Sequence, residues 1–242
     1  MSEDVVSALS LKSLCISYDD KKVIDDVSLD VKQGEIFGLI GLNGAGKTTT
    51  IKAILGLRDE DNGQIQILGE DKLSAESRKS LAYLPEKFDP PWFLTGMEFL
   101  KFSMSLYKKP FDPDVMLDVA RNLALDTDAL KRRMDTYSKG MKQKLGLMGT
   151  LLTGGRLFIL DEPMSGLDPM ARSLVKNMIQ NMRGKHNTIF LSSHILADME
   201  EICDRVAVLH KGKIRFVGAP NELKETTHTD NLERAFLDYI EN

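Results

Sequence analysis

The stretch Gly41-Leu42-Asn43-Gly44-Ala45-Gly46-Lys47-Thr48 decides the fold. It has the spacing G-x-x-x-x-G-K-[ST], follows the apolar run 36–40, and opens a predicted helix over about 47–57. Glycines let the backbone wrap around an anion, and N–H groups at the start of a helix point toward its oxygens. The alternative, a tight glycine turn without a ligand, does not account for the strand before it and the helix after it.

This loop predicts a site for the phosphates of a nucleotide. We expect residues 41–48, together with Thr49, to hold them. Lys47 would reach the β- and γ-phosphates, and the Thr48 hydroxyl would bind Mg²⁺. The expected ligands are therefore ATP and Mg²⁺.

A second apolar run ends in two adjacent acids. Residues 156–162 read Arg-Leu-Phe-Ile-Leu-Asp-Glu. Asp161 suits a contact to Mg²⁺, and Glu162 suits polarising an attacking water, because phosphoryl transfer depends on a positioned nucleophile and offset charge. Two acids at a strand end can also be solvated polar residues. With the glycine loop upstream, the pair indicates a P-loop NTPase.

The pattern along the chain predicts an α/β fold in one domain over 1–242, with a P-loop NTPase core. We expect a mostly parallel sheet, an N-terminal antiparallel β subdomain, an α-helical subdomain inserted at about 86–150, and a helical tail at about 221–242. Thr95 with Glu98 predicts a capping box, and Asp112-Pro113 a helix start. Asn62-Gly63 predicts a turn. Strands are expected at 9–18, 22–31, 36–40, 64–68, 81–84, 156–160, 188–192, 206–209 and 213–217, with a further helix at 169–182.

Composition limits the possible partners. The formal net charge is −4, so the chain lacks the basic excess that is typical of nucleic-acid-binding proteins. No run approaches the roughly 20 apolar residues that span a bilayer, and residues 1–4 are acidic, unlike a signal peptide. We expect any membrane role to be peripheral. Cys15 and Cys203 fit no metal pattern and are expected to be reduced, buried thiols.

Further motifs, in a fixed order, resemble the ABC ATPase family from Tyr18 to about Pro220. Tyr137-Ser138-Lys139-Gly140-Met141-Lys142-Gln143 is similar to the family's signature, usually Leu-Ser-Gly-Gly-Gln; Ser138 and Gly140 match. Ser165-Gly166-Leu167-Asp168 resembles the D-loop, and Leu191-Ser192-Ser193-His194 resembles the segment of the switch histidine. Tyr18 sits where the family places an aromatic that stacks on adenine.

The resemblance implies a pair of ATPase subunits arranged head to tail around two ATP molecules. Each γ-phosphate would meet one subunit's loop and the other's Ser138 and Gly140. His194 would act with Glu162 in catalysis, and Asp168 would belong to the nucleotide-binding set. The implied partners are a second copy or a homologous ATPase subunit and a separate integral membrane subunit, which would hold the chain at the cytoplasmic face of the membrane.

Two departures from the family narrow the resemblance. Glu86, in Tyr83-Leu84-Pro85-Glu86, replaces a usual glutamine and could bind Mg²⁺ through oxygen. Met141 replaces the usual glutamine of the signature. Both variants, and residues 231–237, resemble a branch of exporters. The alternatives are a family member that regulates a membrane protein without transport, or one that acts on nucleic acid or ribosomes.

The segment 86–93 carries three aromatic residues, Phe88, Trp92 and Phe93. Because aromatic residues are enriched at binding hot spots, we expect them to line a groove for a helix of the membrane subunit. The alternative is that they pack beneath the helical insertion.

Overall fold

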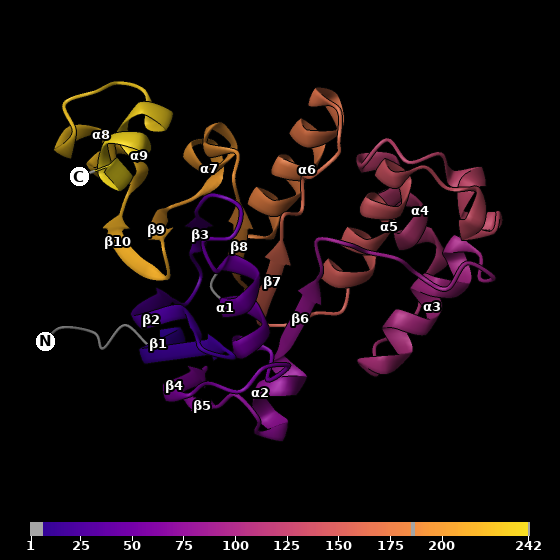
Figure 1. Cartoon of the computed structure of the whole chain (residues 1–242). Coiled ribbons are helices and arrows are strands. Elements are labelled where there is room, and N and C mark those ends of the chain that lie inside the picture. Colours follow the sequence, from indigo (N-terminus) through magenta and orange to yellow (C-terminus); the bar gives the residue numbers. More distant parts are fainter. Residues whose placement is uncertain (1–6, 185–186, 242) are drawn as a thin grey trace, which may run out of the picture.

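The computed structural model describes residues 7–184 and 187–241, so the acidic start at 1–4 lies outside the described residues. Two sheets share the left and centre of Figure 1, and a group of helices lies to the right. The expected α/β class is confirmed, with an antiparallel N-terminal sheet and a second sheet that is largely parallel.

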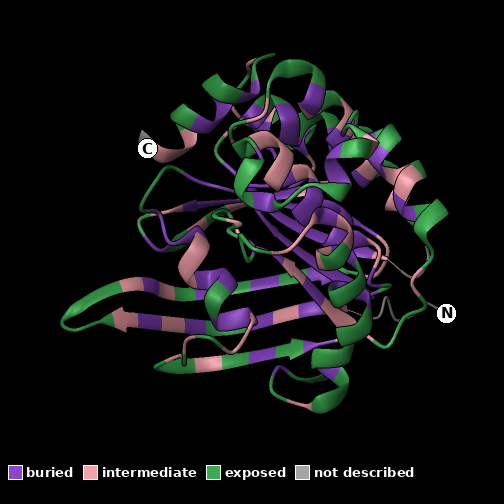
Figure 2. Cartoon of the chain, turned by 90° about the vertical axis from the view of Figure 1, so that its right-hand side faces the viewer, coloured by how far each residue is buried: buried purple, intermediate pink, exposed green. Residues whose placement is uncertain are grey.

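The N-terminal sheet has the strand order β2-β1-β4-β5. Its strands are β1 (Ser7–Tyr18), β2 (Lys21–Lys32), β4 (Asn62–Ile67) and β5 (Glu70–Asp71). Buried and exposed residues alternate along β2 and β4, because each strand turns one face to the core (Figure 2).

The predicted turn at Asn62-Gly63 is wrong, because both residues belong to β4. Gly63 has a φ of 109°, and a Cβ there would lie 2.6 Å from the carbonyl oxygen of Lys12. The pairing of β1 with β4 shifts register between Lys12 and Cys15. The glycine therefore allows close approach beside a bulge.

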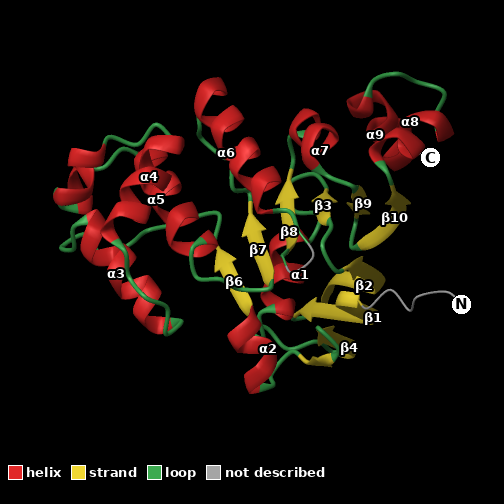
Figure 3. Cartoon of the chain, turned by 180° about the vertical axis from the view of Figure 1, so that it is seen from behind, coloured by secondary structure: helices red, strands yellow, loops and turns green. Residues whose placement is uncertain are grey.

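The second sheet has the order β10-β9-β3-β8-β7-β6, which Figure 3 shows from behind. Strands β3 (Ile36–Ile40), β7 (Leu157–Asp161) and β8 (Thr188–Ser193) are buried throughout, as expected for parallel strands covered on both faces. The edge strands are β6 (Leu81–Leu84) and β10 (Lys213–Gly218), and β9 (Arg205–His210) lies between β10 and β3. Adjacent parallel strands thus bring the ends of β3, β7 and β8 together.

Helix α1 (Lys47–Ile54) packs between the two sheets, where Ile51, Ala53 and Ile54 join the core. It ends earlier than the predicted 57. Gly56 has a φ of 66°, and the N–H of Leu57 donates to Lys52 O at 2.8 Å, which closes the helix with a left-handed glycine cap. Helices α6 (Pro169–Met182) and α7 (Leu196–Ile202) add buried apolar residues to the core, and α2 (Ala75–Ser80) lies between β5 and β6 in the chain.

The segment between β6 and β7 forms the helical group. It contains α3 (Gly96–Leu106), α4 (Pro113–Asn122), two 3₁₀ turns (Thr127–Lys131 and Met134–Thr136) and α5 (Lys139–Leu151). The capping box of Thr95 with Glu98 and the Asp112 cap are both confirmed.

The C-terminal helices are α8 (Pro220–Thr226) and α9 (Leu232–Glu241). Phe216 of β10 stacks edge-on against Tyr239 of α9, with ring centroids 5.5 Å apart. Within the described residues, no helix has the length and apolar character needed to cross a bilayer. Cys203 is buried as expected, but Cys15 is only half-buried.

Candidate functional site

The loop of residues 41–46 joins β3 to α1 in a conformation that depends on its glycines. Gly44 and Gly46 have φ values of 80° and 113°. A Cβ at Gly41 would lie 2.6 Å from the carbonyl oxygen of Leu209, so a larger residue there would displace β9. Thr48 and Thr49 follow in the first turn of α1, whose N–H groups face outward from the helix start.

Three side chains from distant parts of the sequence meet beside this loop. Lys47 Nζ donates to Gly41 O at 2.7 Å and lies 3.5 Å from Glu162 Oε1. The other carboxylate oxygen of Glu162, Oε2, is 2.9 Å from His194 Nδ1. Lys47 and Glu162 are both buried, whereas the His194 side chain is 46% exposed. The structure thus places a cation, an acid and an imidazole together at one point.

Asp161 lies behind this group, next to the start of α1. Its Oδ2 accepts a hydrogen bond from Thr48 Oγ1 at 3.2 Å, and its Oδ1 accepts one from Ser192 Oγ at 2.5 Å. Burial raises the pKa of Asp161, the bonds from Ser192 and Thr48 lower it, and the charges of Glu86 and Glu162 raise it further.

The residues around Asp161 fit Mg²⁺. A carboxylate and a hydroxyl are adjacent hard oxygen donors, and Mg²⁺ commonly takes one or two protein oxygens while keeping water or phosphate as its other ligands. Within 7–184 and 187–241, no group of three or more His, Cys, Asp or Glu side chains forms a complete metal cage. The Thr48 hydroxyl and the Asp161 carboxylate suit a cation that takes its remaining ligands from water or phosphate.

A cavity of about 360 Å³ opens over the loop. Most of the expected nucleotide-binding residues line it, while Gly41, Ala45 and Asp161 are buried behind the lining. The lining consists of Tyr18, Val23, Leu42, Asn43, Gly44, Gly46, Lys47, Thr48, Thr49, Glu86, Glu162 and His194.

Tyr18 lines the cavity and is 39% exposed. The guanidinium carbon of Arg58 lies 4.6 Å from its ring centroid, and Arg58 Nη2 donates to Ser17 O at 2.6 Å. One face of the ring is therefore covered by a cation, while the residue still lines the cavity. Neither Arg58 nor Val23 was expected from the sequence.

Three expected nucleotide-binding residues of the described chain lie outside this cavity: Ser138, Gly140 and Asp168. Ser138 Oγ accepts a hydrogen bond from Met141 N at 3.2 Å and so caps α5. Asp168 Oδ1 accepts one from Ala171 N at 2.9 Å and caps α6. Within one copy, these residues begin helices and do not meet the phosphate loop.

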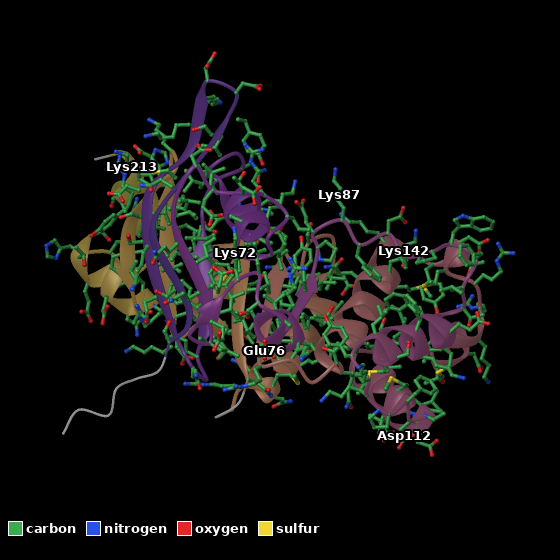
Figure 4. The ribbon with its side chains drawn as sticks, turned by 90° about the horizontal axis from the view of Figure 1, so that it is seen from below. Lys72, Glu76, Lys87, Asp112, Lys142 and Lys213 are labelled. Atoms are coloured by element: carbon green, nitrogen blue, oxygen red, sulfur yellow. The ribbon has the colours of Figure 1, made fainter. Side chains whose placement is uncertain are left out.

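The aromatic segment after β6 divides into two parts. Phe88 packs inward against Phe99, with centroids 5.4 Å apart. Trp92 and Phe93 are 61% and 59% exposed, and the Arg133 guanidinium carbon lies 5.0 Å from the Trp92 ring. Figure 4 shows this loop, marked by Lys87, reaching from the core toward the helical group, where Lys142 is labelled.

Comparisons with known proteins agree with this geometry. The family model described as ABC transporter matches residues 24–165. A solved structure titled as the ATP binding subunit of an ABC transporter superposes with a TM-score of 0.88 at 32% identity, covering 96% of this chain and 99% of that one.

Two curated relatives extend the comparison. An uncharacterized ABC transporter ATP-binding protein from a Nostoc strain is 38% identical over 85% of this chain. The match spans only 62% of that relative's length. The bacitracin transport ATP-binding protein of Bacillus licheniformis is 37% identical over 93% of this chain and 71% of its own.

The phosphate loop, the two acids and the sheet order define a P-loop NTPase. The chain belongs to the ABC transporter family, whose ATP-binding proteins are ATPases.

Proposed function

We propose that this chain binds ATP with Mg²⁺ and hydrolyses it as the energy-coupling subunit of an exporter. The meeting of Lys47, Glu162 and His194 beside the phosphate loop carries the proposal. Lys47 is placed to move from Gly41 O and Glu162 onto the phosphates. Glu162 would then orient and polarise the attacking water, and His194 would contact the γ-phosphate.

Mg²⁺ would be held by Thr48 and Asp161, with Glu86 near enough to line the same cavity, and would offset the charge on the phosphates. Tyr18 would stack on the adenine. Because the signature residues Ser138 and Gly140 lie outside the cavity, we infer that a second copy, or a homologous ATPase subunit, supplies them in a head-to-tail pair with Asp168 at its interface.

We further propose that the pair acts on a separate integral membrane subunit and lies at the cytoplasmic face of the membrane through it. The export direction is supported by the resemblance of residues 83–86 and 137–141 to an exporter branch, and the bacitracin transport relative is compatible with it.

Phosphate release by the purified chain tests the central step. We expect release with ATP and Mg²⁺, and loss of both release and ATP binding in Lys47→Ala. Lys79→Ala, at an exposed lysine of α2, is the matched control. Release that is unaffected by EDTA, or that survives Lys47→Ala, would contradict the proposal. Stimulation by nucleic acid but not by a co-expressed membrane subunit would favour the alternative of a nucleic-acid machine.

A further inference from the structure

Ser192 occupies a position in the sheet where one hydroxyl can reach both acids. It belongs to β8, next to β7, and its Cα is the ladder partner of the Asp161 Cα. The residue is fully buried, with 0% exposure. Its neighbours earlier in the strand, Ile189 to Leu191, are all apolar. A buried hydroxyl at this point therefore lowers the stability of the fold unless it makes hydrogen bonds.

The hydroxyl of Ser192 makes two bonds that use its donor and one acceptor site. Its O–H donates to Asp161 Oδ1 at 2.5 Å. Its oxygen accepts the backbone N–H of Glu162 at 3.1 Å. Since Asp161 Oδ1 is engaged in this way, the other oxygen, Oδ2, is left facing Thr48 at the start of α1.

The hydrogen bond from Glu162 N to Ser192 Oγ stabilises a strained backbone conformation at Glu162. Glu162 has a φ of 49°, in the left-handed region that a residue with a side chain adopts at a cost of about 1 kcal/mol or more. Its N–H is held by both the side-chain and the carbonyl oxygen of Ser192, at 3.1 and 3.2 Å. This turn aims the Glu162 carboxylate at Lys47 and His194.

We propose that Ser192 is a positioning residue that orients the metal-binding oxygen of Asp161 and the carboxylate of Glu162 through a single hydroxyl. This inference rests on the proposed function, because it assigns Asp161 to Mg²⁺ and Glu162 to water. Outer partners of metal ligands fix their orientation, and removing one commonly lowers metal affinity or activity by roughly 10- to 100-fold.

The decisive variant is Ser192→Ala, which removes one oxygen and adds no bulk. We would measure the affinity for a non-hydrolysable ATP analogue, adenylyl imidodiphosphate, by calorimetry with Mg²⁺ and with EDTA. We expect the affinity with Mg²⁺ to fall roughly 10-fold while that with EDTA is unchanged. In the ATPase assay, kcat should fall at saturating ATP and Mg²⁺.

Thr188→Val is the matched control, because Thr188 lies on the same strand, is 1% exposed, and accepts a hydrogen bond from Gly34 N at 3.0 Å away from the acids. Its affinity ratio between Mg²⁺ and EDTA should equal that of the wild type. An equal change in both variants would overturn the proposal, since it would reflect the loss of any buried hydroxyl.

A double-mutant cycle separates this inference from the proposed function. In an Asp161→Asn background, Ser192→Ala should no longer change the Mg²⁺ effect on affinity, because its target is gone. If Asp161→Asn itself leaves the Mg²⁺ effect intact, the proposed function fails. If Asp161→Asn abolishes it but Ser192→Ala has no effect in the wild-type background, only the role of Ser192 is refuted.

Discussion

Glu162 and His194 are joined across 2.9 Å, from Oε2 to Nδ1, although they are 32 residues apart in the chain; Glu162 directly follows β7 and His194 directly follows β8. The same carboxylate faces Lys47 through Oε1 at 3.5 Å. One acid is thus shared by two basic side chains. ATP phosphates would compete with this acid for Lys47, which frees the carboxylate when the nucleotide arrives.

Replacing Glu162 by glutamine should stop turnover while sparing binding. The change keeps the shape but removes the charge that orients water, so we expect kcat to fall by about 10²-fold or more. ATP should still bind, and size-exclusion chromatography should show an accumulated ATP-bound dimer. Glu200→Gln, at a half-exposed acid paired with Lys224, is the control and should retain kcat. Near-normal turnover in Glu162→Gln would return Glu162 to a structural role.

The stacked pair of Tyr18 and Arg58 should contribute to base binding. Tyr18→Ala should weaken ATP binding by about 1–3 kcal/mol, the scale of base–aromatic stacking, and Tyr18→Phe or Tyr18→Trp should largely preserve it. Arg58→Met, which keeps the apolar stem, should cost about 0.5–1 kcal/mol through the lost cation–π contact. Tripolyphosphate, which has no base, serves as the control ligand in calorimetry. A similar loss for both ligands would mean that these residues shape the loop and do not contact the base.

Glu86 should strengthen the binding of Mg²⁺ at the nucleotide site. It lines the cavity, and its charge contributes to the raised pKa values of Asp161 and of Tyr83, the latter raised to about 12 chiefly by burial. We expect Glu86→Gln to need somewhat more Mg²⁺ for half-maximal activity and Glu86→Ala to need more still. Titrations of phosphate release against Mg²⁺ measure this. Identical curves for all three proteins would make Glu86 a linker residue.

Alanine substitutions in the aromatic segment should affect either the stability of the chain or its assembly with the membrane subunit, depending on which ring is removed. Phe88 packs on Phe99, so Phe88→Ala should lower the free energy of unfolding by roughly 2–3 kcal/mol, somewhat less than for a fully buried phenylalanine. Trp92→Ala and Phe93→Ala, at exposed rings, should leave thermal unfolding almost unchanged but weaken co-purification with the membrane subunit. If Trp92→Ala and Phe93→Ala both assemble normally, these two rings do not line the proposed groove. Phe88 already fits the alternative, because it packs beneath the helical group.

The positions of most strands and of the phosphate loop could be predicted because each depends on local sequence. The run 36–40 and the glycines that follow it specify a buried strand, a tight loop and a helix without reference to the rest of the chain. The predictions from local sequence are wrong at two glycines that have another structural role. Gly63 allows close approach of two strands instead of a turn, and Gly56 ends α1 before Leu57.

Residues that act through distant partners could not be predicted in this way. Ser192 reads as part of a strand, and only the alignment of β8 beside β7 shows its bonds to Asp161 and Glu162. Arg58 lies 40 positions from Tyr18 in a charged loop that resembles any solvated connection. Ser138 and Asp168 were recognised by resemblance, and one chain alone places them at helix starts outside the cavity.

The pairing of β6 with β7 has a kinetic consequence. These neighbouring strands are separated in the chain by the whole helical group at 85–156, and β6 lies at the edge of its sheet with β7 as its ladder partner. Closing so long a loop has an entropic cost that shorter connections avoid, so this ladder is expected to form late, after the intervening helices have collapsed. The amides of Leu81 to Leu84 should then exchange with solvent sooner than those of β3 or β8, and the least protected ladder of the core would be the one next to the helical group.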